Sequence, residues 1–386
     1  YKILPVSFAY LNDRAAAAGL QDLAPEDLLL RRQVRLDTAD IGERVAGQVV
    51  MVTGAAGSIG SEITRQVAAV GPSRLVLLDT NENGLYFLYR DLRHQLPSVA
   101  IEPEVGDVRD AARVRALFAQ HRPALVFHAA AHKHVPLMET APEEAVKNNV
   151  GGCRNLIRVA ADFGVQRFVL ISTDKAVNPT SVMGVTKRVA ELVVAEYASK
   201  GHAGFTAVRF GNVLGSAGSV VPLFKSQIAA GGPVTVTHPD CRRYLMTIPE
   251  AVGLVLAAGL RDYGDLCILE MGEPIRILDL ARLMITLTGR VPDKDIPIVF
   301  TGLRPGEKLD EELMTEEEAA RSVRIGDAIR AVSNPAPPAG FGVSVDALEA
   351  AAAAGDRVEV IRLLQELVPS FRPLTRTEVT VAAWIG

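Results

Sequence analysis

The sequence predicts an α/β protein built on a doubly wound parallel sheet, with a second, smaller α/β domain. Two observations support this prediction. From Gln48 onward, short and continuously apolar runs alternate with amphipathic stretches, and such runs are typical of strands whose two faces are both covered by helices. After Gly211, loops rich in glycine and proline separate shorter helical stretches, as expected of a domain that caps the strand ends.

The apolar runs give the order of the elements. The clearest strands are predicted at residues 49–53, 75–79, 124–128, 168–172 and 206–210. Amphipathic stretches predict helices near residues 59–70, 83–96, 110–120, 141–163 and 183–200. The alanine-rich stretch 343–367 predicts two terminal helices, and the proline-rich segment 334–340 predicts an extended linker. Near the N-terminus, Pro25 followed by two acids predicts a short helix.

The composition excludes several classes of protein. The 386 residues carry a net charge of −4 and give a pI near 6.0, which does not indicate a surface for nucleic acid. Cys153, Cys241 and Cys267 lack metal-ligand spacing, which favours reduced structural thiols and no metal site. The sequence holds neither a signal peptide nor an apolar run of about 18 residues. Because the first residue is Tyr1, we expect the native start to lie upstream.

A glycine-rich turn follows the first strand. It runs Gly54-Ala-Ala-Gly57-Ser-Ile-Gly60, so a helix N-terminus could face a pyrophosphate. Asp79 ends the next strand about 20 residues further on, where a carboxylate binds the adenosine ribose diol and repels a 2′-phosphate. The pattern favours NAD over NADP, the alternative being an ordinary turn and a strand-capping aspartate. The predicted cofactor contacts are Gly54, Gly57, Ser58, Ile59, Gly60, Asp79, Asp107, Val108, Ala129, Ala130, Ala131 and Lys187.

Four further motifs carry a resemblance to a known family. They are His128-Ala-Ala-Ala-His-Lys-His-Val-Pro136, Ser172-Thr-Asp-Lys-Ala-Val-Asn-Pro-Thr180, Arg209-Phe-Gly-Asn-Val-Leu-Gly215 and Thr301-Gly-Leu-Arg-Pro-Gly-Glu-Lys-Leu309. From about Asp27 to Pro373, the chain resembles the extended short-chain dehydrogenases, and within them the nucleotide-sugar 4,6-dehydratases of bacterial polysaccharide biosynthesis. The best match is the large, membrane-tethered type that acts on UDP-N-acetylglucosamine.

This resemblance implies a Rossmann fold, tightly bound NAD and a three-step dehydration. First, C4 of the sugar, which carries the 4-hydroxyl, is oxidised. Water is then eliminated across C5 and C6, and finally C6 is reduced, which leaves a 4-keto-6-deoxy sugar. The expected product retains configuration at C5. The alternatives are a C5-inverting dehydratase, a UDP-sugar 4-epimerase and, in a different class, a non-catalytic NAD-binding protein.

The resemblance also implies a place for the protein. We expect it at the cytoplasmic face of the bacterial inner membrane, tethered only through a segment outside this chain. We also expect a homodimer or larger homo-oligomer, paired through the helices at 141–163 and 183–200.

The catalytic residues are expected at the end of the strand 168–172. Short-chain dehydrogenases of this kind use Tyr-x-x-x-Lys, but here Met183 takes the place of the tyrosine before Lys187, and none of the seven tyrosines precedes a lysine by four positions. Asp174 is the candidate acid and Lys175 the candidate base. In these roles Asp174 needs a raised pKa and Lys175 a lowered pKa, which a dry cleft could supply. Their alternative is a surface ion pair.

The remaining roles follow from the same motifs. Thr173 should contact the 4-hydroxyl, whose proton passes to Asp174, through Thr173 to Asp174, or to water. Lys187 should hold the nicotinamide ribose, although a solvated helix lysine is the alternative. The expected substrate contacts are Lys133, His134, Asn212, Arg242, Arg304 and Glu307, of which the first two could equally be loop packing.

The motifs divide the chain into four parts. We expect a lead segment at 1–46, an NAD-binding domain at 47–211, a mainly UDP-sugar-binding domain at 212–342 with segments that return to the sheet, and terminal helices and a tail at 343–386.

Overall fold

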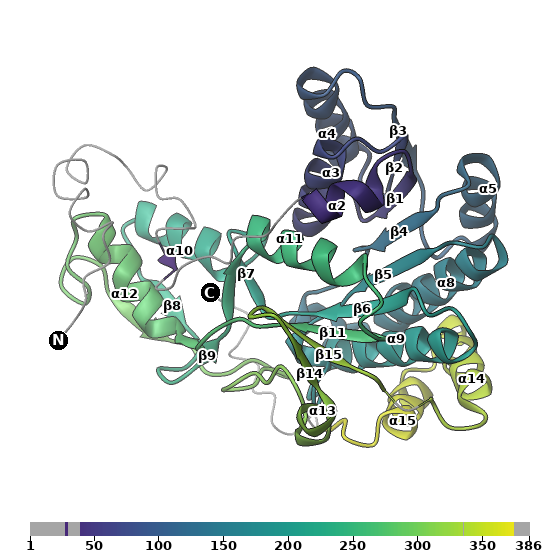
Figure 1. Ribbon diagram of the computed structural model, residues 1–386. Helices are drawn as coiled ribbons and strands as arrows, with labels where there is room; N and C mark the ends of the chain where they lie inside the picture. The colour runs from purple at the N-terminus through teal and green to yellow at the C-terminus, as the bar shows by residue number, and fades with distance from the viewer. Residues whose placement is uncertain (1–27, 30–38, 335, 374–386) are drawn as a thin grey trace.

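The computed structural model describes residues 28–29, 39–334 and 336–373. Its centre is a nine-stranded sheet in the order β14-β15-β11-β6-β5-β4-β1-β2-β3 (Figure 1). The parallel strands are β1 (Val49–Thr53), β2 (Arg74–Asp79), β3 (Ile101–Val105), β4 (Leu125–His128), β5 (Arg167–Ile171), β6 (Phe205–Arg209) and β11 (Leu266–Leu269). Antiparallel strands β15 (Ile329–Val332) and β14 (Val323–Ile325) complete one edge.

Helices cover both faces of this sheet. One face carries α3 (Ser58–Ala69), α4 (Glu82–Gln95) and α11 (Ile248–Gly259), and the other carries α5 (Ala111–His121), α8 (Gly152–Asp162) and α9 (Val182–Ser199). The buried side chains accordingly form two separate apolar clusters, one on each face. The doubly wound fold predicted from the sequence is confirmed. The strand order of the sheet reverses between β1 and β4. In folds of this kind, ligands bind at the carboxyl ends of the strands where the order reverses.

Two local features differ from the sequence prediction. The strand β3 was missed because its sequence, Ile-Glu-Pro-Glu-Val, is mostly polar and contains Pro103; it lies at the edge of the sheet, where a proline is tolerated. The predicted helix at 141–163 is three pieces: α7 (Pro142–Ala145), a π-helical segment η3 (Val146–Gly151), and α8. Single π-helical turns are frequent near functional sites.

Beyond β6 the chain builds a smaller lobe beside the strand ends (Figure 1). Three two-stranded pairs form there: β7 (Asn212–Leu214) with β10 (Leu245–Thr247), β8 (Val234–Val236) with β13 (Ile298–Phe300), and β9 (Arg242–Arg243) with β12 (Ile275–Arg276). Helices α10 (Val220–Ala229) and α12 (Ile277–Leu287) pack on them around a third apolar cluster. Leu28 and Leu29 join this cluster; the rest of the helix predicted near Pro25 lies outside the described residues.

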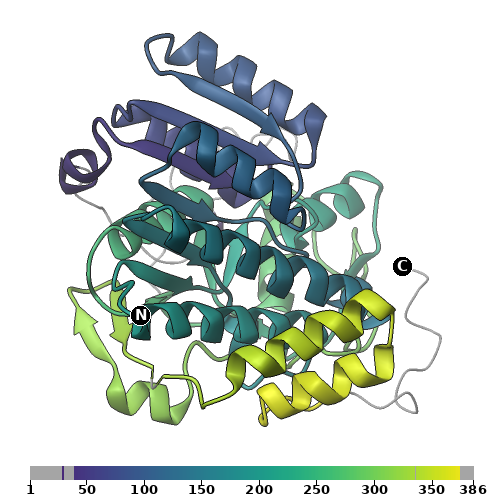
Figure 2. The ribbon, with the colours of Figure 1, turned by 90° about the vertical axis from the view of Figure 1, so that its right-hand side faces the viewer.

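The chain then returns to the large sheet and ends in a helical hairpin. Helix α13 (Glu316–Arg321) precedes β14 and β15, and α14 (Phe341–Ala354) and α15 (Arg357–Leu367) follow them. These two helices, predicted at 343–367, lie across α7, η3 and α9 (Figure 2). Within the described part of the chain, every helix is too short or too polar to span a membrane.

Candidate active site

The glycine-rich turn joins β1 to α3 and is shaped for close backbone contact. Gly54 has a φ of 68°, and a Cβ atom there would lie 2.5 Å from the backbone nitrogen of Ala130. A Cβ atom on Gly60 would lie 2.0 Å from the carbonyl oxygen of Gly54. Helix α3 begins after Gly57 without a side-chain cap, so its first N–H groups are free to bind an anion.

Asp79 closes β2 beside this turn. Its Oδ2 accepts a hydrogen bond from the backbone N–H of Ala56 at 2.8 Å, and its Oδ1 accepts one from Asn81 at 2.8 Å. A cleft of about 230 Å³ opens here. Of the predicted cofactor contacts, it is lined by Gly54, Gly57, Asp79, Asp107, Val108, Ala129, Ala130 and Ala131. Hydrogen bonds from Arg109 lower the pKa of Asp107.

A larger cleft of about 540 Å³ continues from the first. The two share Gly57, Ala129, Ala131 and His132. Of the other predicted site residues, the larger cleft is lined by Ser58, Ile59, Gly60, Lys133, His134, Thr173, Lys175, Met183, Lys187 and Asn212. The structure therefore joins most of the predicted cofactor and catalytic residues in one continuous groove at the strand ends.

The end of β5 forms a tight turn that presents Thr173, Asp174 and Lys175. Thr173 caps a short 3₁₀ helix, Asp174–Ala176, and its hydroxyl donates to Asp174 Oδ1 at 2.9 Å. The same oxygen lies 3.0 Å from the Nζ atom of Lys175. The carboxyl of Asp174 is fully buried, and its Oδ2 has no hydrogen-bond partner among the described residues. Full burial argues against the simple surface ion pair considered above.

Lys175 is held by three oxygens. Besides Asp174, its Nζ donates to Asn212 Oδ1 at 3.3 Å and lies 3.5 Å from Glu311 Oε1. Burial opposes the charged ammonium, but the carboxylates of Asp174 and Glu311 outweigh it and raise the pKa of Lys175. The lowered amine pKa expected from the sequence is therefore wrong for this arrangement, because Asp174 and, from a distant segment, Glu311 both stabilise the ammonium.

Met183 and Lys187 face the groove from the first two turns of α9. Both side chains are buried. Burial lowers the pKa of Lys187. Burial of His128, together with the nearby charge of Lys187, lowers the pKa of His128 to about 3. His128 therefore stays neutral, and its Nδ1 shares a hydrogen bond with the Thr53 hydroxyl at 2.8 Å.

The predicted substrate contacts divide into two groups. The Nζ atom of Lys133 donates to the carbonyl of Ala217 at 2.6 Å, and His134 packs on Gly218, so both lie beneath the loop after β7. Arg242 and Arg304 are exposed and do not line the larger cleft. A further residue, Arg243, was not singled out from the sequence; it is buried and donates to Glu307 Oε1 at 3.0 Å.

Asn149 fixes the loop after β4. From the π-helical segment, its side-chain amide accepts from the N–H of His132 at 2.8 Å and donates to the His132 carbonyl at 3.1 Å. It also donates to the Thr186 hydroxyl on α9 at 3.0 Å. These bonds hold the loop after β4 against the π-helical segment and α9.

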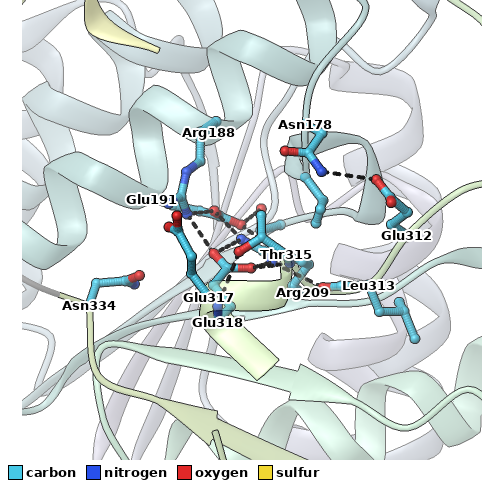
Figure 3. A network of polar contacts seen from close by, with 12 residues as sticks. Asn178, Arg188, Glu191, Arg209, Glu312, Leu313, Thr315, Glu317, Glu318 and Asn334 are labelled. Atoms are coloured by element: carbon cyan, nitrogen blue, oxygen red, sulfur yellow. Dashed lines mark hydrogen bonds and ion pairs between the residues drawn. The ribbon is translucent and has the colours of Figure 1, made fainter. Parts of the chain in front are cut away.

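A buried ionic network joins Glu191, Arg209 and Glu318 (Figure 3). The hydroxyl of Ser172 donates to Glu191 Oε1 at 2.6 Å. Glu191 on α9 pairs with Arg209 on β6, and Arg209 pairs in turn with Glu318 on α13. Burial opposes ionisation of Glu191, but Arg209 lowers its pKa to about 2. The network ties the segment that holds Glu311 to the strand end that holds Asp174.

Comparisons with known proteins show which family the chain resembles. A family model described as "Polysaccharide biosynthesis protein" matches residues 50–333. The chain is 49% identical over 319 residues to the probable polysaccharide biosynthesis protein EpsC of Bacillus subtilis, covering 82% of this chain and 53% of the relative. It is 49% identical over 311 residues to the capsular polysaccharide biosynthesis protein CapD of Staphylococcus aureus, covering 80% and 52%. The chain thus spans about half the length of these curated relatives.

A solved structure is also similar. The X-ray structure of Pen from Bacillus thuringiensis superposes with a TM-score of 0.69 at 34% identity, covering 75% of this chain and 90% of that chain. The family match covers both the glycine-rich turn and the strand end with Thr173, Asp174 and Lys175. The chain therefore belongs to the polysaccharide biosynthesis protein family and has the fold of the extended short-chain dehydrogenases.

Proposed function

We propose that this chain is the catalytic region of an NAD-dependent 4,6-dehydratase that acts on UDP-N-acetylglucosamine. One observation carries the proposal: the buried carboxyl of Asp174 lies 3.0 Å from the ammonium of Lys175, and Lys175 lines a nucleotide-sized groove together with Thr173, which is bonded to the same carboxyl. Elimination of water needs an acid and a base on neighbouring carbons of the sugar. A redox step alone would not use both groups.

The residues around the glycine-rich turn fit NAD. The uncapped N-terminus of α3 suits a pyrophosphate, and the glycine positions leave room for it against the backbone. The carboxylate of Asp79 suits the adenosine ribose diol and disfavours a 2′-phosphate. When bound there, NAD+ would supply the hydride acceptor for C4 of the hexose and the hydride donor for C6.

The proton steps fall to the residues at the end of β5. Thr173 passes the proton of the 4-hydroxyl to Asp174, along the hydrogen bond of 2.9 Å that already joins them. Asp174 then donates this proton to the 6-hydroxyl as it leaves as water. Lys175, in its neutral form, removes the C5 proton and later returns it to C5.

The substrate class follows from the groove and the family. The relatives named above act in polysaccharide biosynthesis according to their names, and such pathways draw on nucleotide sugars. Lys133, His134 and Asn212 line the part of the groove beyond the glycine-rich turn, where the sugar and its diphosphate would lie. Retention at C5 is part of the proposal, because Lys175 both removes and returns that proton.

Proton NMR in D₂O tests the proposal directly. The protein is incubated with NAD and UDP-N-acetylglucosamine, and we expect a new C6 methyl signal from a 4-keto-6-deoxy sugar. A shift of H4 to the pattern of the C4 epimer, without a methyl signal, would show a 4-epimerase instead. An unchanged spectrum, with NAD retained by the protein, would show a binding protein without this activity.

A further inference from the structure

Glu311 reaches the catalytic turn from a distant part of the chain. It lies between β13 and α13 and approaches Lys175, with its Oε1 3.5 Å from Nζ. Its side chain is only 3% exposed. Its second oxygen, Oε2, is buried and has no hydrogen-bond partner among the described residues. A buried carboxylate with an oxygen that accepts no hydrogen bond is costly to keep charged. The presence of Glu311 at this position therefore needs a chemical explanation.

The surroundings of Glu311 favour uptake of a proton. The charged groups that face it are Lys175 and Asp174 from the end of β5, Arg243 from β9, and Lys308 from its own segment. Burial raises the pKa of Glu311, and the nearby cations only partly oppose this. Arg243, with Nε 4.0 Å from Glu311, is already bonded to Glu307 and to backbone carbonyls.

Lys175 can act as a base only after it loses a proton. Its ammonium faces Asp174, Asn212 and Glu311, at 3.0, 3.3 and 3.5 Å. The amide oxygen of Asn212 is too weak a base to accept that proton. Asp174 already accepts the hydroxyl of Thr173 and is assigned to the 4-hydroxyl proton. Glu311 is the acceptor that remains among the three.

We propose that Glu311 accepts a proton from Lys175, so that the free amine can remove the C5 proton of the sugar. Glu311 is thus a positioning residue that acts through Lys175, and the idea rests on the dehydratase function proposed above. An N–H bond of Lys175 breaks, an O–H bond of Glu311 forms, and the electron pair stays on the nitrogen.

The remaining steps balance. The C5–H bond breaks as a new N–H bond forms on Lys175, and its electron pair flows into the enolate while C6 loses water protonated by Asp174. After C6 is reduced, Lys175 returns its proton to C5 and recovers one from Glu311. The protein ends in the charge state in which it began, and the 4-hydroxyl proton leaves in the water.

The test compares pH profiles of turnover with UDP-N-acetylglucosamine. In the wild type the proton passes internally, so kcat should be flat through the neutral range. In Glu311→Gln, Lys175 must lose its proton to solvent. We expect kcat to fall about 100-fold at neutral pH and to rise about tenfold per pH unit toward the wild-type value at alkaline pH. Glu311→Asp should keep a flat profile, and Glu312→Gln, at the exposed neighbouring position, should match the wild type.

The outcomes separate this inference from the proposed function. If the wild type forms no C6 methyl product, the dehydratase function itself is wrong and the inference goes with it. If the wild type forms the product but Glu311→Gln is equally slow at every pH, Glu311 is merely structural. Normal turnover of Glu311→Gln at neutral pH also overturns the inference. Thermal unfolding of each variant shows whether it is folded, and the Glu311→Asp profile decides the matter if Glu311→Gln is not.

Discussion

Arg209 and Glu191 form a buried ion pair, in which Nη2 of Arg209 lies 2.7 Å from Oε2 of Glu191. Neither side chain is more than 1% exposed. Glu318 provides a second carboxylate, 2.7 Å from Nη1 of Arg209. Because Glu191 also accepts the hydroxyl of Ser172, the pair links the interior of the sheet to the residue directly before Thr173. Its integrity therefore affects both stability and the geometry of the turn after β5.

Removing the arginine should destabilise the protein strongly. Arg209→Leu leaves Glu191 and Glu318 buried without their main cation, and the loss of one partner of a buried pair costs about 3–5 kcal/mol. Urea unfolding measures this difference. Arg324→Ala is the matched control, because Arg324 is 56% exposed and its carboxylate partner is fully exposed; such a pair contributes about 0–1 kcal/mol. Equal effects of the two substitutions would contradict this account.

The same network predicts how stability changes with pH. The folded protein holds the pKa of Glu191 near 2, below its ordinary value of 4.5. A lowered carboxyl pKa stabilises the fold above pH 4.5, and this contribution is lost as the pH falls from 4.5 toward 2. The difference in unfolding free energy between the wild type and Glu191→Gln should therefore be constant above pH 5 and shrink below pH 4.5. A difference that does not depend on pH would show that Glu191 is not the titrating group.

Substitution of either Asp174 or Lys175 alone should lower turnover. Asp174→Asn cannot donate a proton to the leaving hydroxyl, and Lys175→Ala cannot take the C5 proton, so each should lower kcat by about 100-fold or more. Formation of the C6 methyl signal in NMR measures kcat. Met183→Leu is the comparison in the same groove: its thioether exchanges no proton, and a swap of similar volume should cost less than about tenfold. Near-normal turnover of both Asp174→Asn and Lys175→Ala would refute the assignment.

The glycine-rich turn at residues 54–60 gives a test of the proposed NAD site that does not depend on turnover. A methyl group at Gly60 would meet the Gly54 carbonyl at 2.0 Å, so Gly60→Ala should distort the turn and weaken NAD binding by about tenfold or more. Calorimetric titration with NAD measures this. Gly42→Ala is the control, because its Cβ would meet only Val70 at 3.9 Å. An unchanged affinity in Gly60→Ala would mean that NAD does not lie against this turn.

Local patterns in the sequence were enough to predict the sheet and the places where its strands β1 and β5 end. The apolar runs that became β1 and β5 end at Gly54 and at Thr173, and ligand-binding residues follow parallel strands at these points. The position of Asp79 at the end of β2 could be predicted for the same reason. Each of these predictions needed only a strand and the few residues after it.

Features that depend on distant contacts could not be predicted in this way. Glu311 carries no local signal, because it meets Lys175 only through the fold of the whole smaller lobe. The carboxylate of Asp174 and that of Glu311 together raise the pKa of Lys175, and the second of these could not be predicted from the sequence. Arg242 and Arg243 are neighbours in sequence, and only the pairing of β9 decides which of them is buried.

The terminal hairpin covers the helices expected to pair two copies of the chain. Leu364 on α15 is fully buried in the same apolar cluster as Val146 and Val189, on η3 and α9. Arg154 on α8 also pairs with Asp346 on α14 at 2.8 Å. Leu364→Ala should therefore cost about 2–5 kcal/mol of stability, as expected for a cavity in a packed core.

Val358→Ala is the control, because Val358 is an 81% exposed position of the same helix. This substitution should change stability by less than about 0.5 kcal/mol. Urea unfolding of both variants decides the point: if Leu364→Ala is as stable as Val358→Ala, the hairpin is not part of the folded core, and the face of α7 and α9 beneath it is open to a second copy.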